Sequence, residues 1–133
     1  MIPVLSDHNC IGQARELFRM LGRLKYDALI ETKLVLFTAV QLDDAADDET
    51  VWQLCQEQRF LLLTSNRRTV DGDLSLEAVV RRNYAPDILP VLTIGDPDRV
   101  LHDSDYCKQC AERLAEIIFD LDDYVGVMRL YLP

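Results

Sequence analysis

A chain of 133 residues, with 49% hydrophobic and 28% charged side chains, is long enough to bury its own core and is neither disordered nor fibrous in composition. Its formal net charge of −9 works against binding of bulk DNA, because duplex nucleic acid is held largely through neutralised phosphates. No apolar run approaches the roughly 20 residues that span a bilayer. We therefore expect one cytoplasmic domain over residues 1–133, with no membrane segment.

Short β-prone runs alternate with helix-period stripes along the chain. The β-prone runs predict strands at residues 3–6, 34–37, 60–65, 89–94 and 128–132. The stripes predict helices at residues 11–21, 51–58, 75–83 and 104–120, with a further helical turn or two within 24–32. Because strands that alternate with helices are joined by right-handed crossovers, this order predicts an α/β domain, a three-layer α/β/α sandwich with a mainly parallel sheet.

The stretch from Phe60 to Arg68 is expected at the centre of this arrangement. Apolar residues up to Leu63 give way at Thr64 to small polar and basic residues. A short apolar run that ends in this way is typical of a central strand buried on both faces. Since ligands of open α/β sheets bind outside the carboxyl ends of the strands, we expect chemistry at residues 64–68.

Three short motifs carry a resemblance to a known family. They are Asp7-x-Asn9 after the first expected strand, Asp48-Glu49-x-Val51-Trp52 at the start of a helix, and Leu62-Leu63-Thr64-x-Asn66 at the end of the central strand. In order and spacing they resemble the PIN-like superfamily. The small bacterial PIN-like proteins of unknown function are the most similar, with Asp-x-Asn, then Asp-Glu before a helix, then Thr-x-Asp-x-Asp. The resemblance covers residues 1–10 and 47–70.

This resemblance implies a nest of carboxylates that holds Mg²⁺ or Mn²⁺ for RNA hydrolysis, as in the toxin-like nucleases of toxin–antitoxin pairs. Hard divalent cations take oxygen ligands, and a hydrated Mg²⁺ orients water and neutralises charge on the phosphate. The residues that the resemblance makes catalytic are Asp7, Asp48, Glu49 and Asn66. The implied metal ligands are Asp7, Asp48, Glu49 and Asp73, and the implied RNA-binding residues are Asn9, Arg67 and Arg68.

The chain departs from the family pattern just after the central strand. Where the family has two aspartates, this chain has Asn66 and Arg68. An amide oxygen coordinates a hard cation without supplying charge, and Arg68 repels one. Asp71 and Asp73 are either substitute ligands or turn residues beside Gly72.

Two functions therefore stay open. The first is a divalent-metal-dependent endoribonuclease with a degraded acidic site, and the second is a non-catalytic PIN-like binding or regulatory module that acts with a protein partner or as a homodimer. Arg67 and Arg68 clamp a phosphate in the first case or neutralise the nearby acids in the second. If an arginine neutralises the acids, we expect poor metal affinity and very low nuclease activity.

Each of the remaining chemically active side chains has a structural interpretation as well as a functional one. Cys107-x-x-Cys110 has the spacing of a metal or redox pair but lies on an apolar helical stripe, so we expect all the cysteines to be free thiols and this pair to face the core. Trp52 is expected in the core or an interface. His8 is either a general base or an exposed turn residue.

Overall fold

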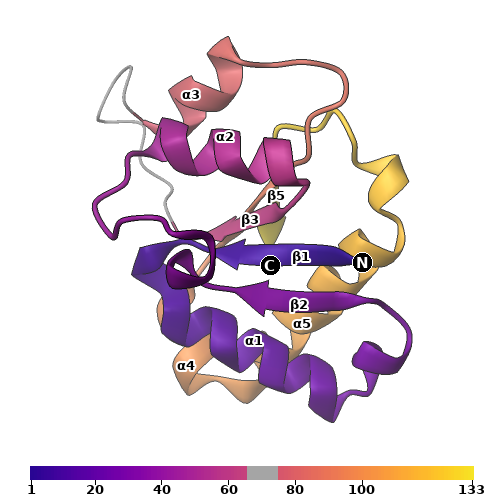
Figure 1. The fold of residues 1–133 in the computed structure, drawn as a ribbon. Helices are drawn as coiled ribbons and strands as arrows, with labels where there is room; N and C mark the ends of the chain where they lie inside the picture. Colours follow the sequence, from indigo (N-terminus) through magenta and orange to yellow (C-terminus); the bar gives the residue numbers. More distant parts are fainter. Residues whose placement is uncertain (66–74) are drawn as a thin grey trace.

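A computed structural model describes residues 1–65 and 75–133, and these residues form a five-stranded sheet covered by helices on both faces (Figure 1). The strands are β1 (Ile2–Ser6), β2 (Thr32–Val35), β3 (Leu61–Thr64), β4 (Val91–Ile94) and β5 (Arg129–Leu132). They pair in the order β2-β1-β3-β4-β5, and every pairing is parallel. The predicted α/β class and parallel sheet are confirmed.

The helices divide between the two faces of the sheet. Their bounds are α1 (Ile11–Arg23), α2 (Asp48–Gln58), α3 (Leu76–Arg82), α4 (Pro97–His102) and α5 (Ser104–Phe119), with 3-10 turns at His8–Cys10, Tyr26–Ala28, Phe37–Val40 and Leu121–Asp123. Helices α1, α4 and α5 cover one face, and α2 and α3 cover the other (Figure 1). This arrangement confirms the three predicted layers. None of the helices in the described part of the chain is long and apolar enough to cross a membrane.

The central strands are buried on both sides, as the unbroken apolar run of β3 indicated. Successive side chains of a strand point to opposite faces of the sheet. Leu61 and Leu63 therefore pack with α1 and α5, whereas Leu62 packs in the second core with α2 and α3. Burial of each such leucine contributes roughly 1.5–3 kcal/mol to the free energy of unfolding. The side chains of β3 therefore stabilise the packing of both helical layers on the sheet.

Strand β2 begins and ends two residues earlier than the predicted strand at 34–37. Its bounds are set by pairing with β1, which extends from Thr32 to Val35 of β2. A 3-10 turn then begins at Phe37. Where the sequence predicted a further helical turn or two within 24–32, the structure has only a short 3-10 turn at residues 26–28. Lys25 precedes this turn with a left-handed backbone, at a φ of 62°, which interrupts the helix.

Strand β4 begins two residues later than the predicted strand at 89–94, and a side chain explains the difference. The N–H of Leu89 donates to Oε1 of Gln56 at 3.0 Å, and its carbonyl accepts from Nε2 of the same residue at 3.1 Å. Pro90 has no N–H to offer a neighbouring strand. Gln56 on α2 thus satisfies the backbone of Leu89 in place of a strand partner, and the ladder starts at Val91.

Helix α4 has no counterpart among the predicted helices. Asp96 caps it, because its side chain accepts from the N–H of Arg99 at 3.3 Å, and Pro97 occupies the first helical turn. An Asp-Pro pair is equally typical of a turn and of a helix start, so the sequence pattern there was ambiguous.

The cysteine and tryptophan predictions are confirmed. Cys10, Cys55, Cys107 and Cys110 are all free and buried. Burial raises the pKa of the Cys110 thiol to about 12, which keeps it protonated at neutral pH. Trp52 is 2% exposed and packs in the core between the sheet and α2.

Candidate functional site

The strand order reverses between β1 and β3, and the carboxyl ends of these two strands form the centre of the candidate site. From β1 the chain passes to β2 on one side, whereas β3, β4 and β5 follow on the other. Ligands of doubly wound sheets bind where the order reverses in this way. Asp7 follows β1 directly and donates its N–H to the carbonyl of Leu63 at 2.8 Å. The structure therefore places Asp7 at the end of β3, although the two segments are far apart in sequence.

Both carboxylate oxygens of Asp7 have donors from the protein. Oδ1 accepts from the N–H of His8 at 2.8 Å, which caps the 3-10 turn, and Oδ2 accepts from the hydroxyl of Thr64 at 2.9 Å. Charge-assisted bonds of this kind are stronger than bonds between neutral groups. They fix the orientation of the Asp7 carboxylate before any ligand arrives.

A row of polar side chains continues from Asp7 across the sheet. Thr64 pairs in register with Thr93 of β4, which pairs with Tyr131 of β5. All lie on the α2–α3 face, because Leu62, two residues before Thr64, packs in that core. We call Asp7, Thr64, Thr93 and Tyr131 the polar row. It brings four strands to one edge of the site.

Thr93 is the least expected member of the polar row. Its side chain is fully buried, yet its hydroxyl oxygen has no hydrogen-bond partner in the described part of the chain. A buried hydroxyl without a partner costs about 1–3 kcal/mol, so its position needs a reason. Sequence reasoning missed Thr93 and Tyr131. In β5, Arg129 and Tyr131 alternate with apolar residues. This pattern could have indicated that Tyr131 lies on the same face as the site.

His8 and Asn9, which follow Asp7, contact residues of two other loops. Nδ1 of His8 lies 3.4 Å from Oδ1 of Asp44, and both side chains are largely exposed. The amide oxygen of Asn9 accepts from the hydroxyl of Ser65 at 3.4 Å, just beyond the end of β3. Asn9 therefore lies at the same edge as Asp7, and its role in RNA binding stays a prediction.

Cys10 lies beneath Asp7 in a buried position that disfavours the thiolate form. Burial raises the pKa of its thiol to about 11, and the charge of Asp7 acts in the same direction. The sulfur lies 3.5 Å from the carbonyl oxygen of Leu63 and 3.7 Å from the hydroxyl of Ser6. A protonated and buried thiol supports the packing below the site and leaves the chemistry to the polar groups.

In the acidic stretch before α2, the side chains of Asp43 and Asp47 accept hydrogen bonds from backbone N–H groups. Oδ1 of Asp47 accepts from the N–H of Thr50 at 2.8 Å and caps α2, and the pKa of Asp47 is lowered by its hydrogen bonds to Thr50. Asp43 accepts in the same way from the N–H of Ala45, also at 2.8 Å. Asp48 and Glu49 form the first turn of α2, where carboxylates are favoured by the helix dipole.

Glu49 has a cationic partner that sequence reasoning did not consider. Nη2 of Arg82, at the end of α3, lies 3.2 Å from Oε2 of Glu49. The two residues are 33 positions apart and meet because α3 packs on α2. The expectation that Arg67 or Arg68 neutralises the acids concerns residues outside the described part of the chain, and Arg82 supplies a charge of the same kind.

The donors of the described residues do not by themselves fit a divalent metal. Within residues 1–65 and 75–133, no three His, Cys, Asp or Glu side chains form a group that could hold a metal ion. Asp7, Asp48 and Glu49 thus do not form the implied nest on their own. The other residues named for the site, Asn66, Arg67, Arg68 and Asp73, lie outside the described residues. We therefore derive no reaction step through a metal.

In comparisons with known proteins, neither a family model, nor a curated protein, nor a solved structure matches this chain significantly. The described residues form a small α/β domain whose five parallel strands pair in the order β2-β1-β3-β4-β5. The resemblance to PIN-like proteins rests on the three short motifs alone.

Proposed function

We propose that this chain is a PIN-like domain that works as a non-catalytic binding or regulatory module. The observation that carries the proposal is the ion pair between Glu49 and Arg82, at 3.2 Å. Of the acids that the family resemblance assigns to a metal, one is thus already balanced by the chain's own arginine.

The electrostatic argument concerns the charge available to a cation. A hard divalent cation is bound more tightly as the number of ionised oxygen ligands rises. The guanidinium of Arg82 repels a cation at Glu49, and the carboxylate of Asp7 is already held by Thr64 and His8. We therefore expect weak binding of Mg²⁺ or Mn²⁺ and very slow hydrolysis of RNA, with a protein partner or a second copy of the chain as the binding target.

A second function, a metal-dependent endoribonuclease, is favoured by one specific observation. Asp7 lies where the strand order reverses, and its carboxylate is oriented by Thr64. In that case Asp48 and Asp73 complete the ligand set and Asn66 contributes an oxygen. The half-exposed pair of Glu49 and Arg82 is weak enough, at roughly 0–1 kcal/mol, for a metal to displace it.

Calorimetric titration with Mn²⁺ separates these two functions. The proposal predicts little heat with the wild type and an unchanged melting temperature. Arg82→Gln removes the balancing charge and should gain a response to Mn²⁺, which the double variant Asp7→Asn with Arg82→Gln should lose. Arg19→Gln is the matched control, because Arg19 forms an exposed pair with Glu16 on α1 and its loss should change nothing.

A strong response of the wild type that Asp7→Asn abolishes would overturn the proposal and establish a metal site. Cleavage of single-stranded RNA in Mn²⁺ by the wild type, and its loss in Asp7→Asn, would then identify the nuclease. Light scattering of the same wild-type sample gives the molar mass and shows whether the binding target is a second copy.

A further inference from the structure

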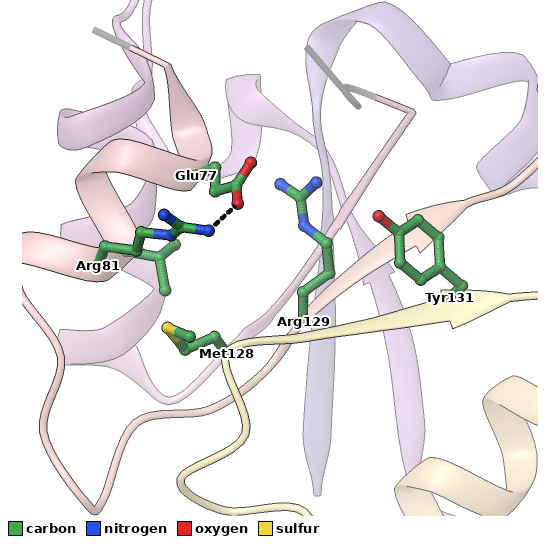
Figure 2. A pocket seen from close by; sticks show the side chains of 6 residues that line it. Glu77, Arg81, Met128, Arg129 and Tyr131 are labelled. Carbon is green, nitrogen blue, oxygen red and sulfur yellow. Dashed lines mark hydrogen bonds and ion pairs between the residues drawn. The ribbon is translucent and has the colours of Figure 1, made fainter. Parts of the chain in front are cut away.

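A cavity of about 140 Å³ lies between α3 and the edge strand β5, at the far end of the polar row from Asp7 (Figure 2). Its walls are Glu77, Val80 and Arg81 of α3, and Met128, Arg129 and Tyr131 of the last segment. Leu130 and Leu132 pack against the opposite core, so the strand turns Arg129 and Tyr131 towards α3.

The side chain of Arg129 stands in the middle of this cavity. Figure 2 shows its guanidinium between the ion pair of Glu77 and Arg81 on one side and the ring of Tyr131 on the other. Nη2 of Arg129 is buried and has no hydrogen-bond partner in the described part of the chain. A buried donor of a charged group without an acceptor is unfavourable, so this atom points to a ligand that supplies one.

Among the described residues that line the cavity, Glu77 carries the carboxylate, and this carboxylate is paired with Arg81. Oε1 of Glu77 lies 2.6 Å from Nη2 of Arg81, one turn along α3. Among the described residues that line the cavity, two carry a guanidinium group and one carries a carboxylate, which gives this lining a local excess of positive charge in a chain whose formal net charge is −9. Such a local excess favours an anionic ligand.

We propose that this cavity binds a phosphate group, with Arg129 as its main donor. The planar fork of a guanidinium presents two parallel N–H donors to neighbouring oxygens of a phosphate. A phosphate has more oxygens than a carboxylate and can carry more negative charge, so it is better suited to accept from Arg129 and from Arg81 at once. The described residues that line this cavity include none of Asp7, Asp48 and Glu49, so phosphate binding here does not depend on the proposed function.

The mouth of the cavity indicates what carries the phosphate. Met128 is 40% exposed and Tyr131 is 47% exposed, so an apolar surface and an aromatic ring lie beside the entrance. An aromatic group attached to the phosphate would cover both. The ligand class is therefore a phosphate monoester with an aromatic organic part, and free inorganic phosphate shares the same anchoring chemistry.

The test is calorimetric titration of the full chain with inorganic phosphate and with phenyl phosphate, with potassium chloride at matched ionic strength. We expect saturable binding of both, tighter for phenyl phosphate, and a loss of roughly tenfold or more in Arg129→Gln. Arg113→Gln should bind as the wild type does, because Arg113 is a comparably buried arginine that pairs with Glu116 on α5. Equal binding of the two phosphates would assign the cavity to the inorganic ion.

Three results would overturn the proposal. They are no saturable binding of either phosphate, binding that is unchanged in Arg129→Gln, and benzoate binding as tightly as phenyl phosphate. If circular dichroism shows that Arg129→Gln does not fold, Arg81→Gln replaces it. We expect a smaller but measurable loss of phenyl phosphate affinity in Arg81→Gln, because the guanidinium of Arg81 in the wild type is partly engaged with Glu77.

Discussion

The hydroxyl of Thr64 donates a 2.9 Å hydrogen bond to Oδ2 of Asp7 and so joins the carboxyl ends of β3 and β1, across 57 positions of sequence. Asp7 belongs to the first of the three short motifs that resemble PIN-like proteins. Its orientation is therefore set by a neighbouring strand as well as by its own loop.

Thr64→Val should lower the free energy of unfolding by about 1–3 kcal/mol, because the Asp7 carboxylate loses one donor while the side-chain shape is kept. Urea denaturation monitored by circular dichroism measures the change. Thr93→Val is the matched control on the adjacent strand. Its hydroxyl oxygen is buried without a partner, so replacing it with a methyl group should leave the stability unchanged or raise it. Equal losses in the two variants would contradict the assignment.

Gln56→Ala should destabilise the start of β4 by about 1–2 kcal/mol, because both backbone groups of Leu89 lose their partner at once. Hydrogen exchange gives the local reading: the amide of Leu89 should exchange much faster in the variant. Gln53→Ala on the same helix is the control, since the side chain of Gln53 makes only a long contact of 3.4 Å with Asn83 among the described residues. Unchanged protection of Leu89 would show that the bridge is not needed.

Gly95→Ala should destabilise the protein by about 1–3 kcal/mol, whereas Gly12→Ala should be neutral or stabilising by up to about 1 kcal/mol. A Cβ at position 95 would overlap the backbone carbonyl oxygen of Pro133, next to the hydrogen bond from the Gly95 N–H to Leu132. A Cβ at position 12 meets open space on α1. Thermal unfolding compares the two, and similar melting temperatures would argue against the close approach at Gly95.

Stability should fall as the pH rises from about 9 towards 11. The pKa of the Cys10 thiol rises from 9.0 to about 11 through burial, and that of Cys110 to about 12. Between these values the unfolded chain releases thiol protons that the folded chain retains, so alkali favours unfolding, by up to about 1.4 kcal/mol per pH unit for each thiol. Below about pH 8 these thiols are almost fully protonated in both states and contribute almost no slope.

Urea denaturation of wild type and Cys10→Ala across this range isolates one thiol, because other groups titrate equally in both proteins. The variant should lose stability less steeply with pH, whatever its stability at neutral pH. Parallel slopes would mean that Cys10 ionises as readily in the folded state as in the unfolded one.

Much of the fold could be predicted because it is encoded by local patterns. The apolar run that ends at Thr64 is the central strand, and the helical stripe from Cys107 to Ile118 is buried as expected. The errors arose where a distant group decides the local structure. Gln56 takes the place of a strand partner at Leu89, and the register of β1 sets the bounds of β2.

The site was less predictable for the same reason. The sequence indicates that Asp7 lies at a strand end, but not that Thr64 orients it or that Arg82 lies against Glu49. Those contacts depend on strand register and on how α3 packs on α2. The environment of Arg129 was missed as well, because a charged residue in a strand suggests a solvent-facing side chain until the neighbouring helix is placed.

The strand order also governs how this chain assembles in time. Each neighbouring pair of strands in the sheet is separated in sequence by at least one helix, so none of the pairs can form across a short turn. Closing these long loops costs conformational entropy before the strand contacts have formed, so we expect this chain to fold more slowly than a helical bundle of similar size. As the chain emerges from the ribosome, β1 can dock β2 early, but its other edge waits for β3. During that interval β1 is an open template for strands of other nascent chains.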